Sequence, residues 1–335
     1  MSEDSITARE SAGVSIARPT SPLRHLRYVI QAMRPKQWVK SGIVLMAFFF
    51  SVNQDPGWTP GDPATWEGLL IRSLITMLIF AVVSGADYLI NDVRDRESDR
   101  MHPRKSRRPI AAGLLSPQAA IIWAAGLWTA GAAVSFAIDW RTGAVVLVYM
   151  ATMLAYTFYL KFQVILDVMV IAAGFVLRAM AGAYAIDVPI SPWLYVVTAL
   201  GALFLAITKR RAEVALLEGR AVEHRSTLGQ YTPALLDQMT AMVTASTVIA
   251  YALYTFTAEN LPSNHTMMLT IPFVLYGFFR YLYLVHLRGE TKPPDEVLLR
   301  DRGLQVTLLV YAVAVLLVFY QRPLLDLAAR LTGTW

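Results

Sequence analysis

The sequence predicts an all-α membrane protein with nine transmembrane helices, and three observations lead to that fold class. Apolar residues make up 56% of the 335 residues and charged residues only 16%, whereas soluble domains carry about 25% charged residues. The apolar residues form uninterrupted runs, each close to the length that crosses a bilayer. The Lys and Arg residues gather in alternate connecting segments, as they do when one side of a membrane receives the basic loops.

Nine apolar stretches are expected to span the membrane. In chain order they are residues 37–53, 69–90, 117–138, 142–160, 163–185, 192–208, 237–257, 266–286 and 304–321. The first is the least regular, because Lys36 and Lys40 lie at its edge. The stretch 323–331 is too short to cross and is expected to lie at the membrane interface.

The orientation follows from the distribution of basic residues. Of the 30 Lys and Arg residues, 24 lie in the N-terminal segment and in the connections that alternating spans place on its side. The opposite side receives only Arg141, Arg322 and Arg330. The positive-inside rule therefore predicts a multi-pass protein of the inner (plasma) membrane with its N-terminus and basic loops in the cytoplasm. This topology explains the net charge of +6 without a nucleic-acid partner.

The chain is expected to have two parts. Residues 1–27 are polar and contain no apolar core after an early basic region, so they predict a mobile cytoplasmic tail rather than a signal peptide. Residues 28–335 are expected to form one transmembrane domain. The chain has no cysteine, which excludes disulfides, thiolate metal sites and thiol nucleophiles.

An acidic cluster follows the second expected span. Asp92, Asp95 and Asp99 are spaced i, i+3 and i+7, which places them on one face of a helix, and Asn91 and Asp87 fall in the same arc. Carboxylates so close together repel unless cations neutralise them. Mg²⁺ prefers oxygen ligands and commonly combines one or two carboxylates with substrate phosphates. The cluster therefore predicts a Mg²⁺–diphosphate site with the three aspartates as catalytic residues and Asn91 as a fourth ligand. The alternative is a solvated helix end that neighbouring arginines neutralise.

Basic residues of the neighbouring loops are candidates for binding phosphate. Lys105 and Arg108 follow the acidic cluster, and Lys209 and Arg210 follow the sixth expected span, with Glu213 close behind. Arg binds phosphate oxygens through two parallel hydrogen bonds. The alternative for Lys105 and Arg108 is the ordinary basic character of cytoplasmic loops. For Lys209 and Arg210 it is anchoring at the membrane interface.

Other candidates lie within or beside the spans. Arg178 falls inside the fifth span, where a charge is costly and marks a functional site by default, although an ion pair with Asp167 or another buried acid is the structural alternative. Tyr156 and Lys161 close the fourth span, and Lys40 enters the first, where each is a candidate substrate contact or an interface anchor. Small residues in the fifth span, among them Gly182, favour close helix packing.

The segment from Asn91 to Asp99 resembles the first aspartate-rich motif, N-D-x-x-D-x-x-x-D, of the UbiA superfamily of intramembrane prenyltransferases. The resemblance extends over residues 30–320 and implies a UbiA-like bundle with cytoplasmic active-site loops. Further segments are similar to one branch, the decaprenyl-phosphate phosphoribosyltransferases. They are Arg34–Lys40, His102–Gly113, Leu177–Gly182, Lys209–Glu213 and Pro294–Arg302. The second aspartate-rich motif of ordinary UbiA enzymes is missing, because residues 209–223 contain Glu213, Glu218 and Glu223 but no aspartate.

The branch resemblance implies a reaction. The 5-phosphoribosyl group of phosphoribosyl diphosphate passes to a polyprenyl (decaprenyl) phosphate in the bilayer, and diphosphate is released, giving a precursor for cell-wall arabinan. Mg²⁺ on the carboxylates would stabilise the leaving diphosphate. Lys209, Arg210 and Arg178 would hold the ribose phosphate and the lipid phosphate. Glu213 would contact a ribose hydroxyl or the metal.

Two other functions remain open at the level of sequence. A prenyl-diphosphate transferase acting on an aromatic or lipid acceptor shares the fold and the first motif, but it normally carries the second acidic motif. A carrier or lipid flippase would also have many spans, yet transporters tend to place charges near the midplane, whereas most polar groups here gather at one rim. The oligomeric state is also open, with a homo-oligomer among the options.

Overall fold

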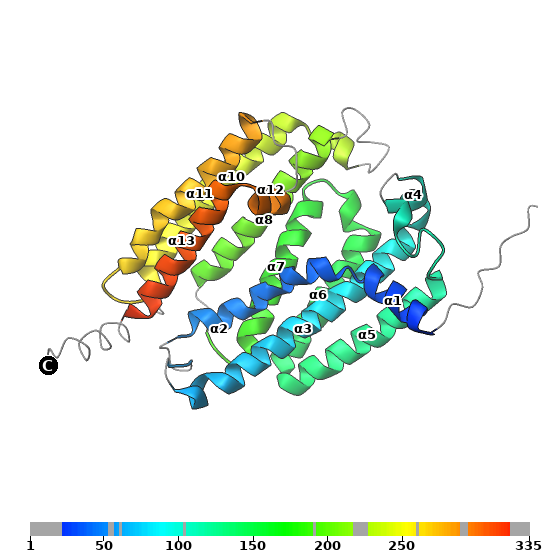
Figure 1. Ribbon diagram of the computed structural model, residues 1–335, viewed down its shortest axis with the longest axis horizontal. Coiled ribbons are helices and arrows are strands. Elements are labelled where there is room, and N and C mark those ends of the chain that lie inside the picture. Colours follow the sequence, from blue (N-terminus) through cyan, green and yellow to red (C-terminus); the bar gives the residue numbers. More distant parts are fainter. Residues whose placement is uncertain are drawn as a thin grey trace, which may run out of the picture.

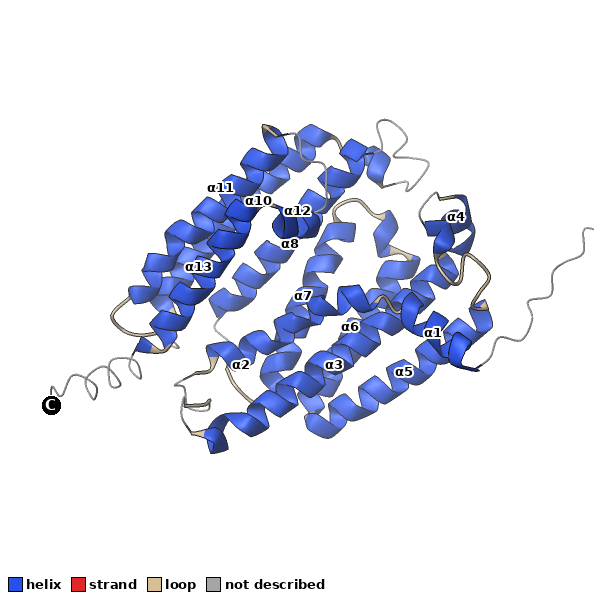
Figure 2. Ribbon diagram, viewed as in Figure 1, coloured by secondary structure: helices blue, strands red, loops and turns tan. Residues whose placement is uncertain are grey.

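The computed structural model of the protein describes residues 22–52, 57–59, 62–102, 105–189, 192–216, 227–258, 261–288 and 294–321. Within these ranges every regular element is a helix, and the one β-bridge joins Val52 to Trp58 (Figure 2). The expected interfacial stretch 323–331 and most of the expected tail lie outside the described residues. The last six residues of the expected tail, 22–27, belong to the first helix instead.

The longer elements follow the order of the expected spans (Figure 1). Those of eleven or more residues are α1 (Pro22–Ala32), η2 (Pro35–Leu45), α3 (Pro63–Arg94), α5 (Pro117–Ile138), α6 (Trp140–Phe158), α7 (Leu166–Ala185), α8 (Pro192–Leu216), α10 (Pro233–Thr257), α11 (Ile271–His286) and α13 (Arg302–Phe319). The shorter ones are α2 (Met46–Phe50), α4 (Arg96–Met101), η3 (Lys105–Arg107), η4 (Leu160–Phe162), η5 (Leu228–Gln230), η6 (Thr266–Thr270) and α12 (Pro294–Arg300).

Local sequence signals start several of these helices. The side chains of Ser116, Asp139, Thr232 and Asp301 each accept a hydrogen bond from a backbone N–H in the first turn of the helix that follows. Proline occupies the first or second position of α3, α5 and α10, where its missing N–H costs no helical bond. These caps explain why the observed starts lie close to the expected ones.

Eight helices in the described part of the chain are long and apolar enough to cross a membrane. They correspond to the second to ninth expected spans, and the expected bounds 117–138 match α5 itself. An all-helical membrane bundle is therefore confirmed.

The first expected span has a different form, because 3-10 helix η2 leads into the short α-helix α2. At about 2.0 Å per residue for the 3-10 part and about 1.5 Å for the α part, the two would cover about 30 Å, near the thickness of a bilayer core. Gly182 of α7 lets this segment come close, since a Cβ built on it would collide with the backbone carbonyl of Val44. The small residue thus serves packing, as the sequence suggested.

Helix α8 is longer than expected, since it continues to Leu216 instead of ending at residue 208. Apart from Val214, residues 209–216 are Lys, Arg, Ala, Glu or Leu, which all favour helix, and the segment contains no Gly or Pro. Lys209, Arg210 and Glu213 therefore lie on a helix and not in a loop.

The spans form a ring. Sequential helices pack side by side from α3 through α5, α6, α7, α8, α10 and α11 to α13, and η2 packs between α3 and α7 (Figure 1). The ring closes where Phe50 of α2 meets Phe319 of α13 edge to face, with ring centroids 5.5 Å apart. The ends of α3 and α4, with η3 and η4, lie at one end of this bundle, which we name the motif end.

Candidate active site

The acidic motif occupies two helices rather than one. Helix α3 ends at Arg94, Asp95 has non-helical backbone angles, and α4 begins at Arg96. Asp95 thus interrupts the continuous helix that the spacing predicted. Asp92 and Asp99 share Arg108 as a partner, whereas Asp95 pairs with Lys161.

Asp92 is the most enclosed of the three, with 2% of its surface exposed. One carboxylate oxygen, Oδ1, accepts hydrogen bonds from Arg34 and, at 3.1 Å, from Arg108. The other oxygen, Oδ2, is buried and has no hydrogen-bond partner among the described residues. A buried carboxylate oxygen without a donor is costly, which makes Oδ2 available to a ligand.

Arg108 also joins Asp92 to Asp99. Its Nη1 donates to Asp99 Oδ2 at 2.6 Å, and Asp99 is buried, with 3% of its surface exposed. Asp92 and Asp99 therefore share one face, as the i, i+7 spacing predicted. Arg108, one of the candidate phosphate ligands, lies at the centre of the motif.

Asp95 pairs with a cation from another part of the bundle. Lys161 of η4 donates to Asp95 Oδ1 at 2.6 Å and to Asn91 Oδ1 at 3.2 Å. Lys161 is buried, with 6% of its surface exposed. The structure thus gathers Asn91, Asp92, Asp95 and Asp99 with Arg108 and Lys161 at the motif end.

Arg34 belongs to this cluster although it was not among the candidate site residues. It follows α1 in a left-handed backbone conformation, with a φ of 54°, and its guanidinium lies 4.4 Å from the centre of the Tyr88 ring. Together with its bond to Asp92, this fixes the entrance to η2 against α3. The signal in the sequence was the basic run Arg34-Pro35-Lys36, which is uncommon at the head of an apolar segment.

Lys105 connects the motif electrostatically to α8. Burial lowers its pKa, and the neighbouring charge of Arg108 lowers it further, while Asp99, Glu213 and Asp95 act in the opposite direction. Lys105 is thus close enough to Glu213 of α8 to interact with it electrostatically, and its role as a phosphate ligand stays a prediction.

A second buried ion pair braces the end of α8. Arg210 Nε donates to Asp167 Oδ2 at 2.8 Å, and its Nη1 donates to Glu213. The Tyr231 hydroxyl donates to Asp167 Oδ1 at 2.6 Å. Burial and this hydrogen bond raise the pKa of Tyr231 to about 12, so the hydroxyl remains a donor at physiological pH. Lys209 is exposed.

Arg178 lies apart from the motif, inside the bundle. Its guanidinium donates to the Tyr149 hydroxyl at 2.6 Å and to the Gly174 carbonyl at 2.9 Å. Asp167 is eleven residues earlier on α7, about 16 Å along the axis, which is too far for the ion pair considered from the sequence. On the neighbouring α3, Asp87 accepts from Trp128 Nε1 at 3.1 Å.

The two remaining candidates are half-buried. Tyr156 lies in the last turn of α6, close to η4 and Lys161, and Lys40 lies midway along η2. Both therefore stay predicted substrate contacts, supported only by their positions in the fold.

The oxygen-rich motif fits a magnesium ion in its chemistry. No three His, Cys, Asp or Glu side chains converge as a metal cluster within the described ranges. Mg²⁺, however, commonly takes only one or two carboxylates and completes its shell with water and phosphate. The unpartnered Asp92 Oδ2 is an oxygen donor of this kind. Asp95 and Asn91 provide further oxygens from the same turn.

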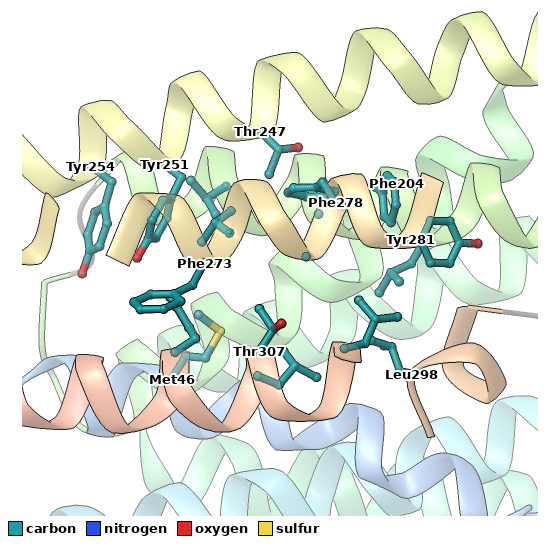
Figure 3. Close-up of a pocket in the computed structure, with 18 of the residues that line it drawn as sticks. Met46, Phe204, Thr247, Tyr251, Tyr254, Phe273, Phe278, Tyr281, Leu298 and Thr307 are labelled. Atoms are coloured by element: carbon teal, nitrogen blue, oxygen red, sulfur yellow. The ribbon is translucent and has the colours of Figure 1, made fainter. Parts of the chain in front are cut away.

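An apolar cavity of about 390 Å³ lies on the other side of α8. Aromatic and aliphatic side chains of α2, α8, α10, α11 and α13 line it, and Figure 3 shows Met46, Phe204, Tyr251, Phe273 and Phe278 around the space. The lining carries hydroxyls but no charged group. Its chemistry suits a hydrocarbon chain.

Comparisons with known proteins agree with this arrangement. The UbiA prenyltransferase family matches residues 42–300. The chain is 34% identical to a decaprenyl-phosphate phosphoribosyltransferase of Mycolicibacterium smegmatis, over 88% of this chain and 94% of that protein. It is 36% identical to one of Corynebacterium glutamicum, over 88% of each. A UbiA homologue from Archaeoglobus fulgidus, bound to GPP and Mg²⁺, has the same fold, with a TM-score of 0.66 and 19% identity over 87% of this chain and 98% of that chain.

The family match covers more than half of the chain, and the identity to the curated relatives extends over nearly all of it. The fold agrees independently, because a solved UbiA homologue has a similar structure, with a TM-score of 0.66. The chain is therefore a multi-pass membrane transferase that belongs to the UbiA prenyltransferase family.

Proposed function

We propose that this protein transfers the 5-phosphoribosyl group of phosphoribosyl diphosphate to a polyprenyl phosphate, with decaprenyl phosphate as the expected acceptor. The proposal takes the activity from the names of the curated relatives, which are 33–36% identical over most of the chain. One structural observation carries it further. The end of α8, where other UbiA enzymes place a second acidic motif, brings Lys209, Arg210 and Arg211 to the motif end instead.

That observation matters because the two kinds of donor differ in charge. A prenyl diphosphate carries one anionic group, whereas phosphoribosyl diphosphate carries a diphosphate and a separate 5-phosphate. The motif supplies Arg34, Arg108 and Lys105 for one anion. Arg is suited to this contact, because its guanidinium binds phosphate oxygens bidentately. The end of α8 carries a second group of cations, in which Arg210 already pairs with Asp167 and Glu213 and Arg211 with Asp237, so the exposed Lys209 is the one proposed to meet the other anion.

Mg²⁺ is the proposed cofactor, held by Asp92 and Asp95 with Asn91 and Asp99 in support. A solved homologue of the same fold was bound to Mg²⁺, and Asp92 Oδ2 is a buried oxygen that lacks a donor in the described structure. When bound, the ion would neutralise negative charge on the leaving diphosphate. Arg34 and Arg108, which both bond Asp92 Oδ1, lie beside this position and would contact diphosphate oxygens.

The transfer step needs little proton chemistry. A phosphate oxygen of the lipid attacks the anomeric carbon of the ribose, and the bond from that carbon to the diphosphate breaks, with the electron pair leaving on the diphosphate. The nucleophile is already ionised at neutral pH, so no general base is required. The residues of this chain hold the two phosphorylated substrates in line and stabilise the charge that develops.

The acceptor would lie with its phosphate at the motif end and part of its isoprenoid chain among apolar side chains. The cavity between α8, α10, α11 and α13 offers such a lining. The positive-inside count supports a cytoplasmic motif end in the plasma membrane, on the side where phosphoribosyl diphosphate is made. The product would serve the synthesis of cell-wall arabinan.

The test uses purified protein in nanodiscs with decaprenyl phosphate, Mg²⁺ and phosphoribosyl diphosphate labelled in the ribose. We expect label in the lipid fraction and no transfer when EDTA replaces Mg²⁺. Asp95→Asn should lose transfer, and Glu97→Gln is the matched control, because Glu97 lies in the same motif with 76% of its side chain exposed. Folded protein that leaves the lipid unlabelled would contradict the proposal.

A further inference from the structure

Helix α1 presents three different faces. Val29 and Ala32 are buried, each with 1% of its surface exposed, and they pack into a cluster with α3 and α5. Leu23, Leu26 and Ile30 follow the spacing i, i+3 and i+7, so they share a second face, and they are 81%, 42% and 43% exposed. Three large aliphatic side chains are thus uncovered on a helix that is not itself a span.

The third face is basic and polar. Arg24, Arg27 and Gln31 repeat the same i, i+3, i+7 spacing one residue later, and all three are exposed. No acidic residue occurs in α1. An apolar face directly beside a basic face, on a short helix, is the pattern of helices that lie in the plane of a membrane interface.

The neighbours of α1 place it at the depth of that interface. Trp123 Nε1 of α5 donates to His25 Nε2 at 3.3 Å. Trp123 lies six residues after the start of α5, or about 9 Å along the helix. Ile121 and Ile122 beside it are 47% and 72% exposed on a helix long and apolar enough to cross a membrane. The uncovered face of α1 therefore continues a surface that faces lipid.

We propose that α1 is an interfacial anchor for an anionic lipid bilayer. Leu23, Leu26 and Ile30 enter the boundary between headgroups and acyl chains, and Arg24 and Arg27 contact anionic headgroups. The charge of the face matches the negative surface of a cytoplasmic leaflet.

The anchor is coupled to the active site through a short connection. Two residues after the end of α1, Arg34 takes its left-handed conformation and pairs with Asp92. Fixing α1 in the interface therefore fixes the backbone that delivers Arg34. This consequence for transfer rests on the proposed function, whereas the anchoring itself does not.

The absence of cysteine in the chain allows a direct test. Leu26→Cys, Ile30→Cys and the polar-face control Gln31→Cys are each labelled with a bimane fluorophore in full-length protein, in nanodiscs that contain phosphatidylglycerol. Doxyl-labelled phospholipid should quench the labels at positions 26 and 30 at least about twofold more than the label at 31, since only the apolar face is inserted. Equal quenching at all three positions would overturn insertion. Labels shielded from both doxyl lipid and aqueous iodide would also overturn it, because a second protein copy would then cover the face.

The lipid charge is tested separately. In the protein whose only substitution is Ile30→Cys, replacing phosphatidylglycerol by phosphatidylcholine should weaken the quenching of the bimane label by doxyl lipid. The added double substitution Arg24→Gln/Arg27→Gln should remove that difference, because both arginines are exposed and make the headgroup contacts. Quenching that is independent of headgroup charge before the substitution would overturn the anionic partner. None of these readouts depends on transferase activity, so they can fail or succeed independently of the proposed function.

Discussion

Asp92 and Asp167 are both buried at the motif end and both pair with arginine, but they are satisfied to different degrees. Asp167 has both oxygens bonded, one to Arg210 and one to Tyr231. Asp92 has two arginines on one oxygen and no partner for the other in the described structure. Asp167 is therefore a structural residue that braces α8, whereas Asp92 has an oxygen available to bind a ligand.

The arginines differ in the same way. Arg210 has 5% of its side chain exposed, so loss of its partner would leave a buried charge. Arg34 and Arg108 are 28% and 24% exposed and can be hydrated when Asp92 is neutralised. We therefore expect substitutions at Asp92 to affect transfer and substitutions at Asp167 to affect stability.

The largest effect is expected for Asp92→Asn. Transfer per folded protein should fall by at least about 1,000-fold, or about 4 kcal/mol in the activation free energy, because the metal that neutralises the diphosphate would lose a negatively charged ligand. The melting temperature in detergent should stay near that of the wild type. Initial rates of lipid labelling measure the loss, and Glu97→Gln serves as the control. A destabilised but active Asp92→Asn protein would reverse the assignment.

The next effect is on stability. Asp167→Ala should lower the free energy of unfolding by about 3–5 kcal/mol, because Arg210 is left without its buried partner. Asp237→Ala is the matched control. Asp237 of α10 pairs with Arg211, the neighbour of Arg210 on α8, but its side chain is 32% exposed. Exposed ion pairs contribute about 1 kcal/mol or less to stability. Thermal unfolding of both variants measures the difference. Equal losses would mean that Asp167 is no special brace.

A smaller loss is expected at the contact between η2 and α7. Gly182→Ala should destabilise the protein by about 1–3 kcal/mol, because the added methyl group meets the backbone carbonyl of Val44 and η2 has to move. Gly126→Ala on α5 is the control, since a methyl group added there would have no other atom within 4 Å. Thermal unfolding is again the measurement. A neutral Gly182→Ala would contradict the close approach of the two backbones.

The smallest effect is expected for Tyr231→Phe, which removes one hydrogen bond from Asp167 and costs about 1 kcal/mol. The pKa of Tyr231 is raised from 10.0 to about 12, so its contribution is complete below pH 10 and is lost as the pH rises through about 12. The difference in melting temperature between wild type and variant should narrow over that interval. A difference in melting temperature that stays constant from pH 10 to about pH 12 would show that the hydrogen bond from the Tyr231 hydroxyl to Asp167 does not contribute to stability.

Periodicity and composition predicted much of the fold, because bilayer-length apolar runs determine the spans and caps determine their starts. They also placed the motif at the end of a span, where α3 finishes. Pairing between distant segments could not be read from them. Arg34 and Asp92 are 58 residues apart, and Arg210 and Asp167 are 43 apart. The partner of each cation depends on how the ring closes, which local spacing does not specify.

The same limit explains Arg178 and the end of α8. A charge inside a span predicts a functional site by default, but it could not predict that Arg178 bonds the Tyr149 hydroxyl and the Gly174 carbonyl. The sequence places the change from span to loop at Lys209, because charge begins there. Helix propensity nevertheless continued the helix through Leu216.

The most direct test of the central claim is a competition between donors. Wild-type protein with Mg²⁺ and decaprenyl phosphate would receive labelled phosphoribosyl diphosphate together with an excess of unlabelled geranyl diphosphate. An aromatic acceptor would be supplied in a parallel reaction with labelled geranyl diphosphate. We predict phosphoribosyl transfer to the lipid that the prenyl donor barely slows, and no prenylated acceptor. Prenyl transfer without phosphoribosyl transfer would contradict the proposed function and assign the prenyl-diphosphate reaction instead.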